Sequence, residues 1–382
     1  MRNLIKTKIS FKSKCELKVG LRNIGLLFSL FISSLFSQQA MALKIKDVTM
    51  SQSSFNPAKG EQVTIHYSID KSAEVILRWY EGRELLIREQ NLGVVKSGSH
   101  QASWDGKDHF SKRVPAEAYH FTLTGLVKGT GETITYDLSD VTGRKDLDVA
   151  NLKWDPKSHE ISYVLSLPAR VNIRVGLDDH GPLLKTILDW VPRAAGEHRE
   201  IWDGMDASKV MDLSAHPLRL IGGQAFSLPK NTVFILPKQT SVNLMDNKKW
   251  QEKRQVNKKS RAKRMHAHVQ QSIESRGDYI AKLILPEKVL AKGNKLPEVS
   301  GNVAVRLDVD KLKRNAVVSR RFEVAFYVDG QYIFESEVGF LPMTFHWDTS
   351  LYPDGEHYLT ANIFGYEGNL GMVTLKVDVK NR

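Results

Sequence analysis

The stretch SWDGKD at Ser103–Asp108 decides the fold, because nearly the same motif returns as IWDGMD at Ile201–Asp206, 98 positions later. A third, shorter echo, HWDTS, stands at His346–Ser350. A tryptophan beside an Asp-Gly pair suits two different roles. Its indole stacks on a ligand if it is exposed, and it closes the end of a hydrophobic core if it is buried. The sequence on either side of the motif distinguishes these roles.

The motif belongs to a longer repeat. Residues 67–78 align without a gap on residues 163–174, at an offset of 96, and the matched apolar positions mostly alternate. Alternation with a period of two is typical of a strand that buries one face. Each copy also starts with a turn-forming pair, Asn56-Pro57 in the first and Asp155-Pro156 in the second. The chain is therefore predicted to contain two copies of one β-domain.

Each residue of the repeated motif has a structural role that needs no ligand. The tryptophan, at the end of a strand, buries roughly 150–250 Å² of apolar surface over the core. The aspartate that follows accepts hydrogen bonds from backbone N–H groups of the turn, and the glycine permits a backbone angle that a Cβ would penalise. Structural corners are therefore favoured over exposed stacking sites. The predicted turn-motif residues are Trp104, Asp105, Gly106, Asp108, Trp202, Asp203, Gly204, Asp206, Trp347 and Asp348.

The C-terminal region has a different sequence with the same kind of pattern. Residues 321–329 alternate between polar and apolar, and Asp329-Gly330 is a hairpin turn signal. A second turn at Tyr352–Gly355 leads into two further alternating segments. Short strands separated by frequent turns predict a third β-sandwich.

The N-terminus has the three parts of a secretory signal peptide. Residues 1–23 carry seven basic residues and one acid, residues 24–36 are apolar, and Ala40-Met41-Ala42 is a small-x-small cleavage site. The 13 apolar residues are few for a membrane span, although an uncleaved anchor is the alternative. The only cysteine, Cys15, precedes the apolar run. The mature chain is therefore expected to be exported, without disulfides or thiolate metal sites.

The formal net charge of +12 is concentrated in two segments, the leader and residues 247–264, and the rest of the chain is close to neutral. Residues 247–264 hold nine basic residues and one acid, which suits attraction to an anionic partner. The alternative is a solvated linker without a partner. The predicted contacts for an anionic partner are Lys248, Lys249, Lys253, Arg254, Lys258, Lys259, Arg261, Lys263 and Arg264.

Motifs for catalysis are not found. The sequence has no Gly-x-Ser-x-Gly elbow, no phosphate-binding glycine loop and no His-Glu-x-x-His. His266 and His268 share a face if their segment is extended, and imidazole ligates zinc, copper or haem iron. Because no third ligand is close in sequence, we expect no metal site. The missing catalytic motifs likewise lead us to expect no cofactor and no enzyme activity.

The first repeat resembles the Ig-like domain of the flagellar hook-capping protein FlgD. The resemblance rests on residues 55–57, 104–108 and 114–123, and the chain departs from the family at Glu117-Ala118, where a glycine is usual. The second copy keeps residues 202–206 and replaces the next segment. Residues 298–382 resemble another bacterial Ig-like module, found in secreted adhesins and as an accessory to polysaccharide-degrading enzymes, through residues 324–330, 345–349, 354–361 and 367–369.

These resemblances imply an all-β fold of tandem Ig-like β-sandwiches joined by a basic linker. The predicted parts are a signal peptide (1–42), two FlgD-type domains (43–146 and 147–237), a linker with a short helix over 266–275 and a strand over 279–285 (238–297), and a third Ig-like domain (298–382). They also imply an exported, non-catalytic scaffold or binding protein that assists assembly or anchoring of an envelope complex or surface appendage. The expected location is the periplasm or the cell surface, without membrane integration after cleavage of the signal.

The expected partners are envelope or appendage proteins, with anionic lipid or polysaccharide as further candidates and nucleic acid excluded by export. Two alternative functions stay open. A carbohydrate-binding accessory protein needs exposed aromatic side chains on one face, for which Tyr327, Tyr332 and Tyr352 are candidates. A periplasmic partner of exported metal or haem redox proteins would use His266 and His268.

Overall fold

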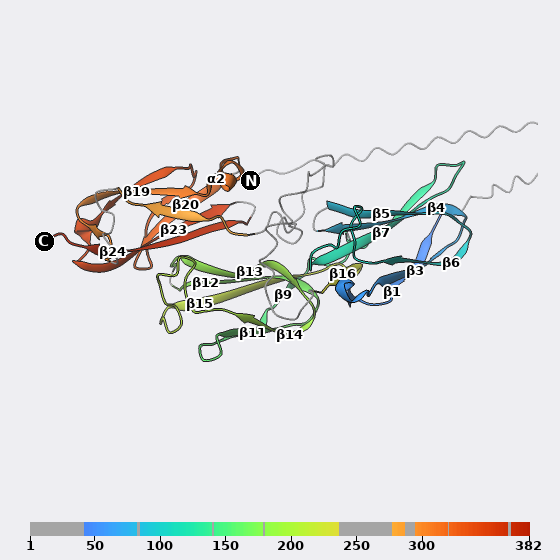
Figure 1. The fold of residues 1–382 in the computed structure, drawn as a ribbon, viewed down its shortest axis with the longest axis horizontal. Helices are drawn as coiled ribbons and strands as arrows, with labels where there is room; N and C mark the ends of the chain where they lie inside the picture. The colour runs from blue at the N-terminus through green and yellow to red at the C-terminus, as the bar shows by residue number, and fades with distance from the viewer. Residues whose placement is uncertain are drawn as a thin grey trace, which may run out of the picture. The chain divides into compact units, whose positions relative to one another are not determined.

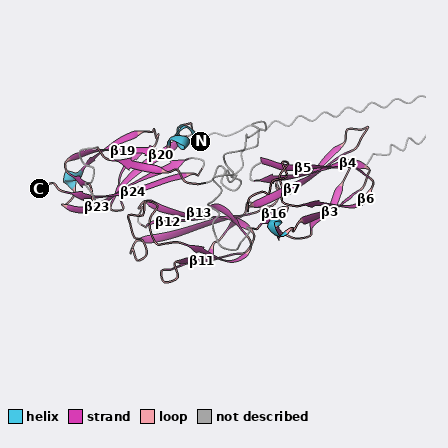
Figure 2. Cartoon of the chain, in the orientation of Figure 1, coloured by secondary structure: helices cyan, strands magenta, loops and turns pink. Residues whose placement is uncertain are grey.

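The computed structural model describes residues 42–81, 85–139, 141–178, 180–236, 277–286, 295–319, 321–365 and 368–382. Strands dominate this part of the chain, and helices are few and short (Figure 2). The strands form pairs of sheets around three separate hydrophobic cores. The expected all-β fold of several β-sandwiches is therefore confirmed.

Sandwich 1 packs a three-stranded sheet against a larger one. The alternation in the repeat predicts β4 correctly, since Ala73, Val75 and Leu77 all face the core. The first sheet has the order β1 (Ile45–Met50), β3 (Val63–Ile69), β6 (Gly98–Trp104), and the second has the order β2 (Ser54–Phe55), β16 (Thr232–Ile235), β7 (Ala118–Leu126), β4 (Ala73–Glu81), β5 (Leu85–Val95), with β8 (Thr133–Tyr136) also paired to β7.

Sandwich 2 repeats much of this plan. Its strand β12 aligns with β4 at the offset of 96 seen in the sequence, and both pair with an 11-residue neighbour through irregular register. One sheet has the order β10 (Ala150–Asp155), β11 (Glu160–Leu165), β14 (Gly196–Ile201), and the other has the order β13 (Leu183–Arg193), β12 (Ala169–Leu177), β15 (Arg219–Ser227), β9 (Asp146–Leu147).

Sandwich 3 uses the strand at residues 281–284, which lies in the segment that follows the basic region and pairs with β19. A short helix, α2 (Lys311–Val318), joins β19 to β20. One sheet has the order β17 (Ala281–Ile284), β19 (Asn302–Val309), β22 (Met343–Asp348), and the other has the order β18 (Glu298–Val299), β24 (Leu370–Val379), β23 (Gly355–Gly365), β20 (Phe322–Val328), β21 (Gln331–Ser336).

The closing strand of sandwich 1 is split in two. In sandwich 3, β24 pairs with β23 in register from Phe364 to Gly355, and its last residues pair in parallel with β18. In sandwich 1 the corresponding edge of β7 is occupied by β8 beside its C-terminal half. Beside its N-terminal half it is occupied by β16 (Figure 1). Asn231 bridges the gap, because its Nδ2 donates to the Phe121 carbonyl at 2.6 Å.

All of sandwich 2 is folded from the residues between β8 and β16. Residues 232–235 stand at the end of the segment that the sequence assigns to the second domain, yet they pair with β7 and β2 of sandwich 1. Sandwich 2 is thus an insertion into the closing edge of sandwich 1.

Candidate functional site

The first Trp-Asp-Gly motif forms a buried corner of sandwich 1. The Trp104 indole is 1% exposed and stacks on Trp79 with ring centroids 4.2 Å apart. Its Nε1 donates to the Lys107 carbonyl at 2.8 Å, and the Lys107 N–H donates back to Asp105 Oδ1 at 3.2 Å. The tryptophan is thus fastened to the turn that follows it.

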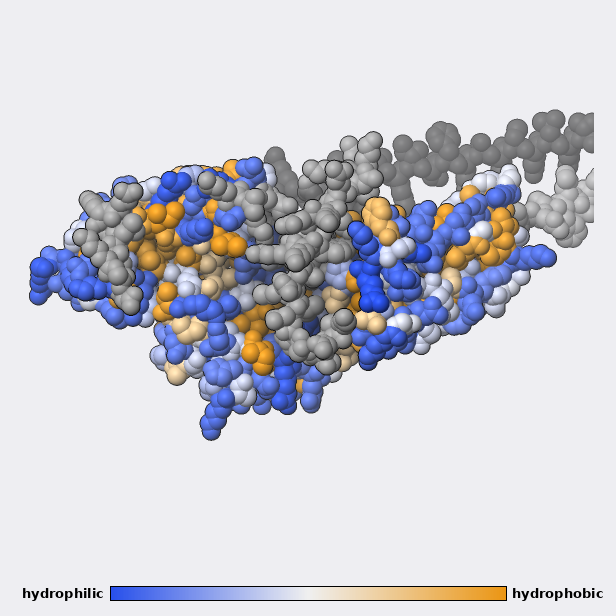
Figure 3. All heavy atoms as spheres, in the orientation of Figure 1, coloured by the Kyte–Doolittle hydropathy of each residue, from blue (hydrophilic) through white to orange (hydrophobic). Residues whose placement is uncertain are grey.

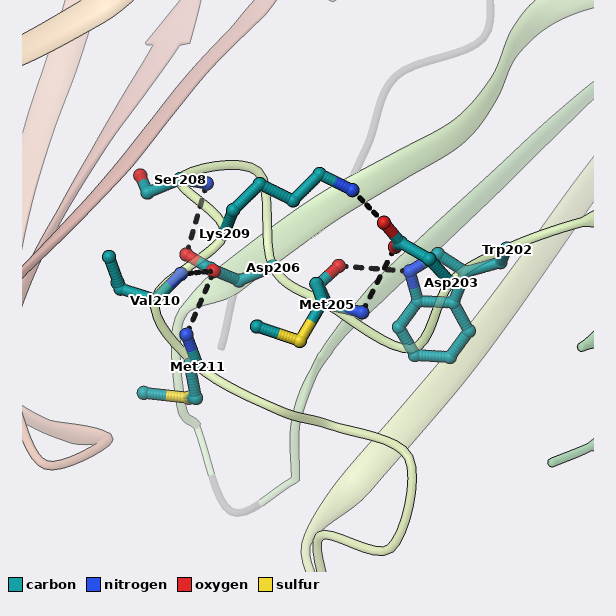
Figure 4. A network of polar contacts seen from close by, with 8 residues as sticks. All are labelled: Trp202, Asp203, Met205, Asp206, Ser208, Lys209, Val210 and Met211. Carbon is teal, nitrogen blue, oxygen red and sulfur yellow. Dashed lines mark hydrogen bonds and ion pairs between the residues drawn. The ribbon is translucent and has the colours of Figure 1, made fainter.

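The second motif repeats this corner in sandwich 2 (Figure 4). The Trp202 indole is 2% exposed, and its Nε1 donates to the Met205 carbonyl at 2.9 Å. The Met205 N–H donates to Asp203 Oδ1 at 3.1 Å, and Lys209 forms an ion pair with the other oxygen of Asp203. The repeated sequence therefore produces the same hydrogen bonds twice.

The last aspartate of each motif is the most buried polar residue of its corner, at 3% exposure for Asp108 and 1% for Asp206. Asp206 Oδ1 accepts the N–H groups of Val210 and Met211 at 2.8 and 3.0 Å. Asp108 Oδ1 likewise accepts two backbone N–H groups, both at 2.9 Å. A buried carboxylate needs such partners. The sequence interpretation placed this role on the first aspartate alone, and the fixed spacing of the second was the available signal.

The glycine is required by both conformation and space. Gly106 and Gly204 have φ angles of 71° and 78°, in the left-handed region. A Cβ at Gly106 would collide with the Pro57 ring, and one at Gly204 with the Ser214 hydroxyl. Both glycines therefore permit a close approach inside the corner.

The third echo reaches the same result with a different turn. Trp347 is 1% exposed, and its ring lies edge-on to Tyr352 at 5.8 Å. Asp348 Oδ1 accepts the Ser350 N–H at 3.1 Å at the start of the short helix η5 (Thr349–Leu351), which stands where the other copies have glycine. All three indoles are buried, so none offers a face to a ligand.

The remaining predicted site residues lie outside the described residues. These are the basic residues Lys248, Lys249, Lys253, Arg254, Lys258, Lys259, Arg261, Lys263 and Arg264, together with His266, His268 and the helix expected over 266–275. Within the described part of the chain, no three His, Cys, Asp or Glu side chains form a group that could hold a metal ion.

The three tyrosines considered for carbohydrate binding do not share an exposed face. Tyr327 is only 7% exposed and lies edge-on to Tyr332 at 6.0 Å. Tyr332 is 53% exposed, whereas Tyr352 is half-buried between Trp347 and His357. Apolar residues instead gather in separate small groups among hydrophilic ones on the face drawn in Figure 3. The burial of Tyr327 counts against an aligned aromatic platform.

A buried ion pair joins sandwich 2 to sandwich 1. Arg170 Nη1 donates to Glu117 Oε1 at 3.0 Å and to the Trp190 carbonyl at 3.2 Å, and both charged side chains are at most 3% exposed. Glu117 is the residue at which the chain departs from the FlgD-type pattern. Its partner across the seam gives that departure a physical reason, because a glycine there would leave the guanidinium without this carboxylate.

A second seam joins sandwich 2 to sandwich 3. The Asn362 amide exchanges two hydrogen bonds of 2.8 Å with the backbone of Leu183, and Arg174 Nη2 donates to the Gly368 carbonyl at 3.1 Å. Burial raises the pKa of Asp278, at this seam, to about 6, with the Thr186 hydroxyl opposing the shift. The polar face of β12 and β13 is therefore used in contacts between sandwiches.

The edge of β15 is the feature that sandwich 2 does not share with the other two. β15 pairs with β12 along its full length, from Arg219 to Ser227. On its other side it pairs with β9 at Ala225 and Phe226 alone, and no other strand of the described residues adjoins Arg219–Gln224. This open edge is the candidate binding site.

No helix among the described residues has both the length and the apolar character needed to span a bilayer.

Comparison with known proteins gives neither a matching family model nor a matching curated protein. Among solved structures, FlgD from P. aeruginosa is 22% identical over 24% of this chain and 67% of its own, with a TM-score of 0.20. A 1.5-MDa bacterial ice-binding adhesin is 11% identical over 89% of this chain and 99% of its own, also at 0.20. Fibronectin(III)-like modules of Clostridium thermocellum CbhA are 9% identical over 87% and 94%, at 0.18. The assignment of the fold therefore depends on the sheets and hydrophobic cores described above and not on these similarities.

Proposed function

We propose that the protein is an exported, non-catalytic scaffold of the cell envelope, built from Ig-like sandwiches, that assists assembly or anchoring of an envelope complex or surface appendage. The observation that carries this proposal is the split closing strand. Because β8 and β16 belong to one sheet and sandwich 2 lies between them in the chain, the two sandwiches cannot separate unless that sheet opens. A scaffold needs its binding surfaces joined to one another, and here two chain connections tether sandwich 2 to sandwich 1.

The corners support a structural use of the Trp-Asp-Gly motif. Their indoles are buried and their aspartates are occupied by backbone N–H groups. Strand edges, loops and the basic segment are then the candidate binding elements, because an exposed sheet edge can bind an extended peptide as an added strand. Residues 247–264 are the proposed docking element for an acidic partner.

Export is supported by the position of Leu43. Cleavage after Ala40-Met41-Ala42 would leave Leu43 as the first residue, and its side chain is buried in the core of sandwich 1. Its backbone nitrogen donates to Glu132, which also pairs with Lys71 at 3.2 Å. Among the described residues, Leu43 is the first with a buried side chain, and it is the residue that the predicted cleavage would expose. The mass of the secreted protein tests the assignment.

The proposal is tested by affinity capture from the native envelope extract. The bait is the mature protein, compared with a variant in which residues 247–264 are replaced by a neutral linker and with one in which the same residues are scrambled. We expect a defined set of envelope proteins on the wild type and the scrambled control, lost from the neutral variant and weakened by salt. Retention of polysaccharide alone, or of nothing, on all three baits would overturn the assembly role.

A further inference from the structure

The open edge of β15 presents backbone groups that no other strand of the described residues pairs with. Ser227 directs both its N–H and its C=O away from β12, because its N–H donates to the Lys145 carbonyl at 2.9 Å and its C=O accepts the Arg144 N–H at 2.6 Å. Alternate residues of an antiparallel strand point their backbone groups to the same side. Ile221 and Gly223 therefore direct their N–H and C=O groups at the open edge, where the described residues provide no partner for them.

The same edge is filled by a strand in the other two sandwiches. In sandwich 3 the strand beside β23 is β24, and its Val377 and Val379 are buried in the core of that sandwich. In sandwich 1 the strands beside β7 include β16, and its Val233 and Ile235 enter the core of that sandwich. The occupant that this edge accepts is therefore an antiparallel strand with apolar side chains at alternate positions. The chain's own next strand, β16, does not provide it, because β16 pairs with β7.

The side chains beneath the edge suit such an occupant. Val149, Leu152 and Ile221 pack against the second core but are only partly buried. The Gly223 backbone lies over the first two, since a Cβ there would stand 3.0 Å from Val149 and 3.1 Å from Leu152. An added strand would cover this apolar strip, as β24 covers the third core.

The edge also lacks the usual protection against strand addition. Natural edge strands are commonly guarded by proline, lysine or an inward-pointing charge. Residues 219–224 read RLIGGQ, with no proline and no lysine, and the one charged side chain, Arg219, donates to the carbonyl of Leu213 at 2.7 Å and also to that of Ser214. Within the described part of the chain, nothing in the sequence of this edge therefore opposes the addition of another strand.

We propose that β15 binds an extended segment of a different protein, which adds as an antiparallel strand along Ile221–Gly223 and places alternate apolar side chains over Val149 and Leu152. This inference rests on the proposed scaffold function and specifies how a partner is held. Affinity comes from the main-chain bonds, and selectivity comes from the alternation of apolar side chains.

The test uses the mature full-length protein and a fluorescent peptide that copies residues 370–379, the strand filling this edge in sandwich 3. We expect saturable binding with new protection of the Ile221 and Gly223 amides in residue-resolved hydrogen exchange. Ile221→Pro removes an N–H that points away from β12, so it should weaken binding by about tenfold, while Ile221→Val should not. The same peptide with N-methylated alternate amides should not bind the wild type, a result that stands even if Ile221→Pro misfolds.

Several outcomes would overturn this inference. They are no binding at millimolar peptide, protection of amides elsewhere instead of at Ile221 and Gly223, and wild-type dimers that Ile221→Pro abolishes, which would assign the edge to a second copy. Failure here is distinct from failure of the scaffold role. If envelope proteins are captured equally by wild type and Ile221→Pro, the scaffold stands and this edge is not its site. If the peptide binds at β15 but no envelope protein is captured, the edge is a binding site and the scaffold function is wrong.

Discussion

Sandwich 1 and sandwich 2 have the same corner and different edges. In both copies the indole N–H of the tryptophan donates to the backbone carbonyl three residues later, and the buried last aspartate accepts backbone N–H groups. At the strand after the corner the copies diverge. β7 has β8 and β16 beside it, whereas among the described residues β15 has the two residues of β9 and no other strand on that side. A motif of six residues thus reproduces a local structure without determining how each sheet is completed.

The equality of the two corners is tested by the change with the largest expected effect. Trp104→Ala and Trp202→Ala should each lower the free energy of unfolding by about 3–5 kcal/mol, because each removes a buried indole. Trp104 should lie at the upper end, since its indole contacts the rings of Phe55, Trp79 and Tyr119, whereas the Trp202 indole lies beside that of Trp154. Thermal unfolding followed by circular dichroism measures both, with Phe110→Ala, an exposed ring beside the first corner, as the control. Unchanged melting temperatures in the tryptophan variants would refute the buried-corner interpretation.

The contact between the two sandwiches is tested next. Arg170→Met should lower the free energy of unfolding by about 3–5 kcal/mol, because it leaves the Glu117 carboxylate buried without this partner. The double variant Arg170→Met with Glu117→Gln should recover much of that loss in urea unfolding. As the control, Arg199→Met breaks an exposed pair with Glu160 and should cost about 0–1 kcal/mol. Similar losses at both arginines would show that the seam does not bury the pair.

The difference in edges is tested through β16. Ile235→Ala should cost about 2–5 kcal/mol, because this side chain enters the core of sandwich 1. Hydrogen exchange after protease digestion should show faster opening of β4 and β7, with β12 unchanged. Leu236→Ala, at a half-exposed neighbouring position, is the matched control. Faster exchange confined to sandwich 2 would contradict the assignment of β16 to sandwich 1.

The smallest effect is expected in sandwich 3, in which β24 fills the edge that is split in sandwich 1 and open in sandwich 2. There the free energy of unfolding should depend on pH through His357 of β23. His357 Nδ1 lies 2.5 Å from Asp329 Oδ2 and Nε2 lies 2.9 Å from the Pro353 carbonyl. Burial opposes the charged form, but these two acceptors outweigh it and raise the pKa of His357 above its usual value. The stabilisation is therefore fully present below the pKa of the unfolded state and is lost as the pH rises through the folded-state value.

Urea unfolding between pH 5 and 9 measures this dependence for the wild type and for His357→Gln. The difference in free energy of unfolding between them should be largest at pH 5 and should shrink as the pH rises. A difference that grows with pH would contradict the imidazolium assignment.

Local features could be predicted from the sequence because their causes are local. The alternation of residues 73–77 gives the buried face of β4, and the corner needs only a tryptophan, a glycine with positive φ and nearby N–H groups. The partner of β16 could not be predicted in this way. Its sequence, TVFI, is apolar enough for either sandwich, and its pairing depends on the register with Ala118–His120, more than 100 residues earlier.

The seams and the open edge were missed for related reasons. Arg170, Asn172 and Arg174 alternate with apolar residues, a pattern that normally marks a solvent-facing side. In the folded chain this side contacts other sandwiches, which no periodicity reveals. The departure at Glu117 was the one signal for a buried pair. The open edge could not be recognised until the strand that fills its counterpart was known.

The central claim is that β16 completes sandwich 1 and leaves β15 open, and amide hydrogen exchange of the unliganded wild type tests it most directly. The Phe234 and Leu236 amides, which donate to the Ser53 and Phe55 carbonyls at 2.8 and 2.9 Å, should be protected. The Ile221 and Gly223 amides should exchange orders of magnitude faster, close to the rate of an unstructured peptide. Equal protection at the two pairs of amides would contradict the claim.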